Sequence, residues 1–152
     1  MTPAFLVANS FLKRSFEENR EISPMKLQKL TYFVYKKYLQ DTGYALFEED
    51  FEVWQFGPVL PSIYREFSHY GARPITDYAY APFDDQHRVL LVADKSREFY
   101  KALDFVWSKY GCYSATKLSE LTHEDETAWK KALDRKEKHL SDDDIEAEEW
   151  LQ

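Results

Sequence analysis

The sequence predicts a mainly α-helical fold with a small β element, an α+β domain of about six or seven helices and one short antiparallel hairpin. Most of the chain carries apolar residues at spacings of three and four, which is the spacing of one helix face. Only four of the 152 residues are glycine, and a fold rich in strands and tight turns would need more. Aromatic residues make up 17% of the chain, so we expect large rings to build its core.

The length favours a single domain that spans residues 1–152, because a chain of this size buries roughly 70% of its unfolded surface in one core. No apolar run approaches the ~18 residues that cross a bilayer, and the N-terminus lacks a signal-peptide pattern. The one cysteine, Cys112, cannot form an internal disulfide, and we interpret it as a small buried thiol. We therefore predict a cytoplasmic protein.

Two helices are predicted at the start of the chain. Residues 3–16 have a broad apolar side, and Thr2 is the candidate N-cap. The second helix begins at Ser23, whose hydroxyl can cap the first turn, and at Pro24, whose fixed φ suits the first helical position. It ends at Gly43, because glycine favours the left-handed conformation that closes a helix.

An apolar stripe along the second helix predicts which of its residues are buried. The stripe consists of Leu27, Leu30, Val34 and Tyr38. The helix also carries four lysines that fall largely outside the stripe, and we expect their ammonium groups to be solvated. These lysines are Lys26, Lys29, Lys36 and Lys37.

A strand and a third helix follow. Residues 51–56 alternate in a way that suits a strand with aromatic residues available to both faces. We expect Gly57 and Pro58 to end the strand, with Pro58 at the first position of a helix that stops at Gly71. Pro61 then falls in the first turn of that helix, where a missing N–H costs nothing.

The composition of residues 72–88 predicts a long irregular segment with one short strand near residues 75–80. Residues 88–93 form a compact apolar run of strand length, which could pair with the strand at residues 51–56. A long loop in a compact domain is often functional, so we take residues 72–88 as a candidate contact surface.

Asp94 can cap a helix that runs to Tyr110, and shorter helices are predicted at residues 114–121 and 124–133. The two short helices have the length of a helix-turn-helix. The second of them begins with three acidic residues, which would face phosphate groups with like charge. Direct DNA binding is therefore kept as an alternative and not as the main prediction.

Ser141 is the predicted N-cap of a last helix that carries much of the net charge of −7. Six of the 27 acidic residues follow Leu140, where there is no basic residue. The other 21 are nearly matched by 20 basic residues, so the body of the chain lacks the basic surplus of nucleic-acid-binding proteins. We expect Ile145 and Trp150 to dock this helix, while its acidic residues stay available to a basic partner.

The residue types predict no catalytic or metal site. The run from His123 to Glu126 lacks the HExxH spacing of a zinc site, so we interpret His123 as a residue that bonds local backbone groups. Cys112 has no evident general base to activate it. Tyrosines spaced by three along the second helix are read as core and rim residues, not as a stacking platform for nucleic acid. We predict no enzyme activity, no metal and no cofactor.

Three blocks of the sequence carry a family resemblance. They are KLQKLTYF (residues 26–33), WQFGPVLPSIYREF (residues 54–67) and LSELTHEDETAW (residues 118–129). In this order they resemble the Panacea domain, also called the SocA-like antitoxin domain, and the resemblance covers roughly residues 4–150. One departure is visible: the family pattern often has proline before the C-terminal tryptophan, where this chain has Ala128 before Trp129.

The resemblance implies an antitoxin, a protein that neutralises a toxin encoded beside it in bacterial or phage toxin–antitoxin systems. Its partner would be a cognate toxin, which such a domain covers by direct binding or delivers, as an adaptor, to a AAA+ protease. We favour direct binding because the chain shows no appended DNA-binding or enzymatic domain. A DNA-binding regulator stays the alternative.

The resemblance also suggests site residues. Ten residues of the family blocks are assigned mainly to architecture, and His123 is expected to act together with Trp129. The ten are Lys26, Leu27, Leu30, Trp54, Gly57, Pro58, Val59, Tyr64, His123 and Trp129. Partner contacts are expected from aromatic residues of the long loop and from acidic residues of the last helix. These candidates are Tyr78, Tyr80, Phe83, Asp142, Asp143 and Asp144.

Overall fold

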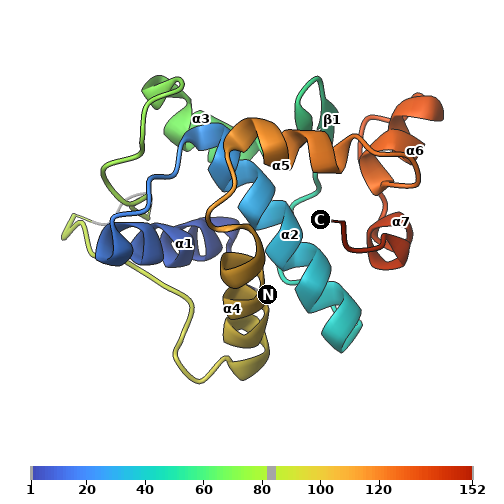
Figure 1. Cartoon of the computed structure of the whole chain (residues 1–152). Coiled ribbons are helices and arrows are strands. Elements are labelled where there is room, and N and C mark those ends of the chain that lie inside the picture. The colour runs from blue at the N-terminus through green and yellow to red at the C-terminus, as the bar shows by residue number, and fades with distance from the viewer. Residues whose placement is uncertain (1, 82–84, 152) are drawn as a thin grey trace.

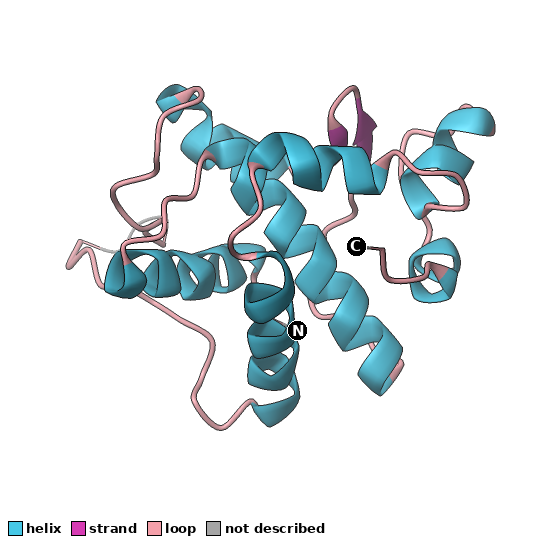
Figure 2. Cartoon of the chain, in the orientation of Figure 1, coloured by secondary structure: helices cyan, strands magenta, loops and turns pink. Residues whose placement is uncertain are grey.

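A computed structural model describes residues 2–81 and 85–151, and helices dominate this part of the chain (Figure 1, Figure 2). The elements are, in order, α1 (Ala4–Glu18), α2 (Pro24–Thr42), β1 (Glu52–Trp54), β2 (Gly57–Val59), α3 (Pro61–Phe67), the 3-10 turn η1 (Ser68–Tyr70), α4 (Arg97–Tyr110), α5 (Ala115–Thr122), α6 (Ala128–Asp134) and α7 (Asp142–Ala147). The strands β1 and β2 pair antiparallel. The predicted α+β fold class is confirmed. Within these described ranges, no helix combines the length and the apolar character needed to cross a membrane.

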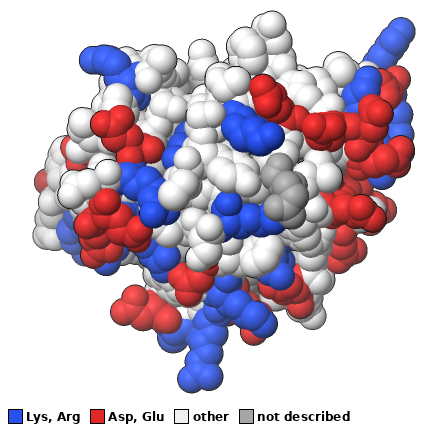
Figure 3. Space-filling model, viewed as in Figure 1, with Lys and Arg blue, Asp and Glu red and all other residues white. Residues whose placement is uncertain are grey.

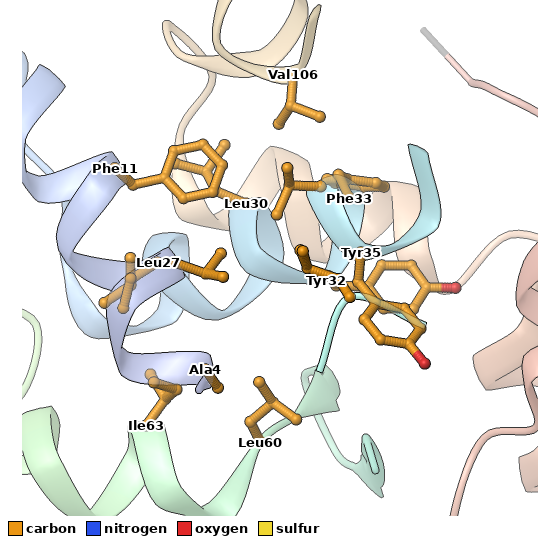
Figure 4. Close-up of a cluster of buried hydrophobic side chains, with 14 of the residues drawn as sticks. Ala4, Phe11, Leu27, Leu30, Tyr32, Phe33, Tyr35, Leu60, Ile63 and Val106 are labelled. Atoms are coloured by element: carbon orange, nitrogen blue, oxygen red, sulfur yellow. The ribbon is translucent and has the colours of Figure 1, made fainter. Parts of the chain in front are cut away.

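Helix α2 runs through the middle of the molecule, and the other elements pack around it (Figure 1). It contacts α1, α3, α4, α5, α7 and β2. Figure 4 shows part of the resulting core, in which Phe11 of α1, Leu27 and Leu30 of α2 and Val106 of α4 belong to one cluster. Twelve of the nineteen residues of α2 are buried, so burial is not confined to a single stripe.

The expectation that the α2 lysines are solvated is wrong for three of the four. Lys26, Lys29 and Lys36 expose at most 7% of their surface, because the elements packed around α2 also cover the side opposite the apolar stripe. Each buried ammonium donates to an oxygen from a distant part of the chain. The acceptors are the Gly111 carbonyl at 2.6 Å from Lys26, the Pro58 carbonyl at 3.1 Å from Lys29 and the Glu148 carboxylate at 2.8 Å from Lys36.

Side-chain caps begin two helices where the sequence predicts them. The hydroxyls of Ser23 and Ser141 each accept a hydrogen bond from a backbone N–H in the first turn of α2 and α7. Gly43 closes α2 with a φ of 77°. Thr2 and Asp94 are not caps, because α1 and α4 begin two and three residues further along the chain.

Two features near α5 and α6 differ from the prediction. Helix α6 begins at Ala128 and not at Glu124, because Thr127 supplies the N-cap and Glu126 turns the chain with a φ of 72°. Cys112 is exposed and not buried, since it lies in the solvent-facing turn that follows α4.

The hairpin replaces the single strand predicted at residues 51–56. Trp54 pairs with Gly57 across the turn, so the chain reverses at two residues. Pro58 therefore lies inside β2 and does not start a helix, as the sequence had suggested. Its ring is tolerated because the N–H of its partner Val53 points away from β2 and donates to the Lys138 carbonyl at 2.9 Å. Helix α3 begins at Pro61 instead.

A segment near the C-terminus extends the hairpin on its β1 side. Glu52 forms an isolated antiparallel bridge with His139, and the Leu140 N–H donates to the Phe51 carbonyl at 3.0 Å. The predicted pairing of residues 88–93 with this strand is therefore wrong, because residues near 139 occupy that edge.

The predicted strands at residues 75–80 and 88–93 do not form either. The buried amide of Asn9 in α1 bonds this segment instead of a strand ladder. Its Nδ2 donates to the Ala79 carbonyl at 2.8 Å and to the Leu90 carbonyl at 3.0 Å, and its Oδ1 accepts from the Ala79 N–H at 2.8 Å. One side chain thus pairs backbone groups that would otherwise need a neighbouring strand.

The last described residues, 148–151, are fixed to α2 by a buried ion pair. The side chains of Lys36 and Glu148 are 1% and 4% exposed, and Glu148 Oε2 accepts from Lys36 Nζ at 2.8 Å. Glu148 Oε1 accepts from the Tyr32 hydroxyl and from the Ala128 N–H, both at 2.8 Å. The Lys36 ammonium also lies 4.1 Å from the centre of the Trp150 ring.

Burial dominates the titration of this network. It lowers the pKa of Lys36, and the adjacent Glu148 carboxylate offsets part of that effect. It raises the pKa of Tyr32 well above its ordinary value, so the hydroxyl stays a donor. The predicted docking of Ile145 and Trp150 is confirmed, since Ile145 is buried and Trp150 packs against the core.

We expect the variant Glu148→Gln to lower the free energy of unfolding by about 3 kcal/mol, because it leaves the Lys36 ammonium buried without an opposite charge. Urea denaturation at pH 7 measures the change. The variant Glu149→Gln, at the exposed neighbouring position, should stay within about 0.5 kcal/mol of the unaltered chain. Equal losses in the two variants would contradict a specific role for the buried pair.

Candidate partner-binding surface

The turn of the hairpin is the most prominent exposed apolar feature of the described family blocks. It projects from the body of the molecule between α5 and α6 in the view of Figure 1, and both helices contact it. Phe56 in the turn is 54% exposed, and Tyr64 on the neighbouring α3 is 47% exposed. The Tyr64 ring packs on the ring of Trp54 with centroids 4.8 Å apart. We call Trp54, Gln55, Phe56 and Tyr64, with the two pockets described below, the hairpin surface.

Four backbone carbonyl oxygens of the hairpin are each bonded to a side chain of α2, α6 or the α5 region. The pairs are Trp129 Nε1 to the Trp54 carbonyl at 2.8 Å, His123 Nε2 to the Gln55 carbonyl at 2.8 Å, Ser119 Oγ to the Phe56 carbonyl at 2.7 Å and Lys29 Nζ to the Pro58 carbonyl at 3.1 Å. These bonds fix the backbone of the turn in one conformation and leave the side chains of Gln55 and Phe56 in solvent.

His123 lies at the centre of this support. Its ring packs 3.9 Å from the ring of Trp129, centroid to centroid. Its Nε2 faces the Gln55 carbonyl, and its Nδ1 lies 2.5 Å from the Ser119 carbonyl. Both nitrogens are therefore directed at backbone oxygens, which is an arrangement for holding the turn and not for binding a metal. Across residues 2–81 and 85–151, no three His, Cys, Asp or Glu side chains gather as metal ligands do.

Gly57 permits the close approach of the hairpin to α2 and α5. Its φ of 116° is one that residues with a side chain rarely adopt. A Cβ at this position would lie 2.6 Å from Thr122 Oγ1 and 2.7 Å from Lys29 Cε. No other residue type fits without displacing one of these neighbours.

Lys29 of α2 bonds the hairpin from the buried side, through the Pro58 carbonyl. It is 1% exposed, and burial lowers its pKa to about 7. Its one hydrogen bond within the described part of the chain goes to Pro58. The side chain that bonds the Pro58 carbonyl therefore changes its protonation state near neutral pH.

Two pockets adjoin Phe56 and share Met25, Gln55 and Phe56 in their linings. The apolar pocket, of about 420 Å³, is walled mainly by the side chains of Met25, Trp54, Val59, Ile63 and Tyr64. The second pocket, of about 670 Å³, is lined by Thr116, Ser119, Glu120, His123 and Glu124 in addition to the three shared residues, and we call it the polar pocket after these five side chains. An aromatic side chain between two adjoining pockets is a typical setting for contact with another macromolecule.

The residues of the family blocks divide between this surface and the core. Seven of them belong to the hairpin or lie against it: Trp54, Gly57, Pro58 and Val59 are in its strands, and Tyr64, His123 and Trp129 contact it. Leu27 and Leu30 are buried in the core, and Lys26 donates to the Gly111 carbonyl at the end of α4.

Two of the three loop residues expected to contact a partner, Tyr78 and Tyr80, lie elsewhere. Tyr78 is half-buried, with its ring packed edge-on against Phe16 at 5.0 Å. The Tyr80 hydroxyl donates to Asp77 at 2.9 Å. Phe83 lies outside the described residues. Of the two described aromatic residues, the structure brings neither Tyr78 nor Tyr80 to the hairpin surface.

Two of the three aspartates in α7 already have partners within the chain. Asp142 accepts a hydrogen bond from the Tyr35 hydroxyl at 2.8 Å, and Asp144 pairs with Arg135 at 2.8 Å. Asp143 is exposed. In Figure 1, α7 and the described part of the loop before α4 lie on opposite sides of the molecule, so Tyr78 and Tyr80 form no common surface with the aspartates of α7.

The arrangement of α5 and α6 does not suit a helix-turn-helix reader of DNA. The first residues of α6, Ala128 and Trp129, are buried, and the Trp129 indole bonds the hairpin. The start of this helix is therefore unavailable to a major groove. The loop before it exposes Glu124, Asp125 and Glu126, whose charge phosphates would repel.

Sequence reasoning missed three residues that build the surface. Phe56 was assigned to a strand, Lys29 was expected in solvent, and Ser119 was not singled out. The signal for Phe56 was its position directly before Gly57, since glycine is common in tight hairpin turns. No local pattern identifies Lys29 or Ser119, because their acceptors are carbonyls from another part of the chain.

Comparisons with known proteins agree on one family. The family model described as "Antitoxin SocA-like, Panacea domain" matches residues 27–130, a range that includes the hairpin, α5 and the start of α6. A protein of Caulobacter vibrioides (strain NA1000 / CB15N) named "Antitoxin SocA" is 31% identical over 125 residues. That alignment covers 81% of this chain and 66% of the relative, so the chain spans about two thirds of the relative's length. No solved structure matches the chain significantly.

We expect the variant Gly57→Ala to destabilise the chain by more than about 2 kcal/mol, since it combines a strained φ with a collision at Thr122 and Lys29. Gly43→Ala is the matched control. Gly43 also has a positive φ, but no atom lies within 4 Å of the point that a Cβ would occupy there, so a loss of about 1 kcal/mol is expected. Thermal and urea unfolding compare the two, and a smaller loss at Gly57 would contradict the close approach.

The lowered pKa of Lys29 predicts a stability that rises with pH. Between pH 7 and 9 the unfolded chain keeps the Lys29 proton, whereas the folded chain has largely lost it. Stability should therefore increase by up to about 1.4 kcal/mol per pH unit from this group, and should level off below pH 7, where both states are protonated. Lys29→Met removes this contribution. Urea unfolding at several pH values measures the slope, and Lys37→Met should leave it unchanged; identical slopes in both variants would contradict the assignment.

Proposed function

Because the chain belongs to the antitoxin SocA-like family with the Panacea domain, we propose that it is an antitoxin that neutralises a cognate toxin protein by binding it directly. On this proposal it acts in the cytoplasm and by forming a stoichiometric complex, not by turning over a substrate. The hairpin surface is the contact region.

One observation carries the choice of this surface: the exposed Phe56 sits on a turn whose backbone is fixed before any partner arrives. Ordering a flexible loop on binding reduces affinity, and a loop held by four hydrogen bonds avoids that cost. Aromatic side chains at the centre of a contact commonly supply most of its binding free energy. Phe56 and Tyr64 are the exposed aromatic side chains that this surface offers to a partner.

The family residues around the hairpin then have an indirect role. Trp129 and His123 position the turn through its carbonyl groups, while Phe56 touches the partner. Tyr78, Tyr80 and Asp143 lie away from this region and are proposed only as a second contact for a large partner.

Direct binding and adaptor-assisted degradation predict different fates for the toxin. A covered toxin stays present in the cell while growth is restored. A toxin delivered to a AAA+ protease disappears, and growth then depends on that protease. We propose the first outcome, because the hairpin surface provides a contact that needs no third protein.

The test is co-expression with the product of the neighbouring reading frame that arrests growth when expressed alone. We expect the chain to restore growth with an undiminished level of toxin. Phe56→Ala should weaken binding of the purified proteins about 10- to 100-fold, because it removes the central ring. Tyr44→Ala is the control, since Tyr44 is 74% exposed and lies beyond the end of α2.

Three results would contradict the proposal. They are growth that stays arrested, a toxin level that falls only when a AAA+ protease is present, and equal affinities for the Phe56 and Tyr44 variants. Binding of duplex DNA with a steep salt dependence would support a DNA-binding regulator instead.

A further inference from the structure

The two pockets beside Phe56 differ in chemistry, and the difference specifies what can occupy them. The apolar pocket has walls formed by Met25, Ile63 and Tyr64. Lys29 contributes to its floor, but the ammonium is covered by the hairpin and donates to the Pro58 carbonyl. An incoming carboxylate would therefore meet no accessible cation there, and an apolar side chain is the occupant that fits.

The polar pocket presents unpaired negative charge. Glu120 and Glu124 are both exposed, and neither forms an ion pair within residues 2–81 and 85–151. No lysine or arginine is among the residues that line this pocket. This contrasts with the acidic C-terminal segment, where Asp144 and Glu148 are neutralised by cations of the chain itself.

The acidic character continues beyond the pocket. Asp125 and Glu126 follow Glu124 in the exposed loop before α6. Figure 3 shows the surface at the top of the molecule, where the hairpin projects, as largely uncharged, with a band of acidic side chains beside it toward α6 and basic side chains at the two ends of that band. The net charge of −7 gives the whole chain the same sign, which favours encounters with a basic partner.

We infer that the hairpin surface recognises a basic segment with an apolar anchor: a large apolar side chain enters the apolar pocket, and a neighbouring lysine or arginine enters the polar pocket. The two pockets share Phe56, Gln55 and Met25, so the anchor and the cation must lie close together in the partner. That the segment belongs to a toxin rests on the proposed function. The preference for its chemistry rests on the pockets alone.

The chemistry can be tested without the toxin by titrating the full chain with two small probes, acetyl-Phe-Arg-amide and acetyl-Phe-Glu-amide. NMR shifts of the ¹⁵N-labelled protein report where each probe binds. We expect both to perturb Phe56 and its neighbours, and the arginine probe to bind about five-fold more tightly at low salt, with the preference shrinking at high salt. Equal affinities, a preference for the glutamate probe, or perturbation confined to another region would overturn the inference.

Variants that remove the negative charge of single residues test whether the preference for the arginine probe comes from the polar pocket. Glu120→Gln with Glu124→Gln should abolish it while leaving the helix unbroken. Asp94→Asn with Glu98→Gln makes the same change of charge at two exposed residues before and within the start of α4, and it should keep the preference. Loss of the preference in both double variants would show a general charge effect and would overturn the assignment to this pocket.

The growth assay separates this inference from the proposed function. With a toxin that the unaltered chain neutralises, Glu120→Lys with Glu124→Lys should weaken binding at least about tenfold, and unchanged binding would overturn the inference while leaving the antitoxin function intact. If the unaltered chain restores growth against no neighbouring product, the proposed function fails, and the two dipeptide probes still decide whether the surface prefers a basic segment.

Discussion

The structure depends on the burial of three lysine amino groups along one central helix. A helix covered on several sides places lysines in the interior, and a buried ammonium is tolerated only when an oxygen accepts from it. Lys26, Lys29 and Lys36 meet this requirement with oxygens from three distant segments: the end of α4, the hairpin and the C-terminal residues. The polar groups of α2 thereby determine where these three segments attach, and the apolar core fills the space between them.

The hairpin surface follows from this constraint. A two-residue turn on an isolated pair of three-residue strands would have little stability of its own. Here Lys29 holds β2 from beneath, residues near 139 extend the edge of β1, and side chains of α5 and α6 bond the carbonyls of the turn. The position of the exposed Phe56 is therefore fixed by contacts of the hairpin with the rest of the molecule and not by the local conformation of the loop.

The sequence predicts the fold class and several helix ends because these depend on local chemistry: Ser23 and Ser141 cap the helices that follow, and Gly43 closes α2. It misplaces the strands because residues 88–93 have the composition of a strand, while Asn9 offers their backbone a partner that no local pattern reveals. The sequence also predicts, wrongly, that the lysines of α2 are exposed, because the periodicity of apolar residues describes a helix with only one buried face. The family blocks indicate the hairpin region, but the exposure of Phe56 and the pairing of Glu148 with Lys36 depend on contacts between distant segments.

The way the turn is anchored has an evolutionary consequence. Every anchoring bond ends on a main-chain carbonyl, and carbonyls are the same whatever side chain a residue carries. Positions 55 and 56 can therefore exchange their side chains without loosening the scaffold that displays them. If the hairpin surface binds the partner as proposed, substitutions at these two codons change the specificity, while Trp129, His123 and Ser119 still hold the same backbone.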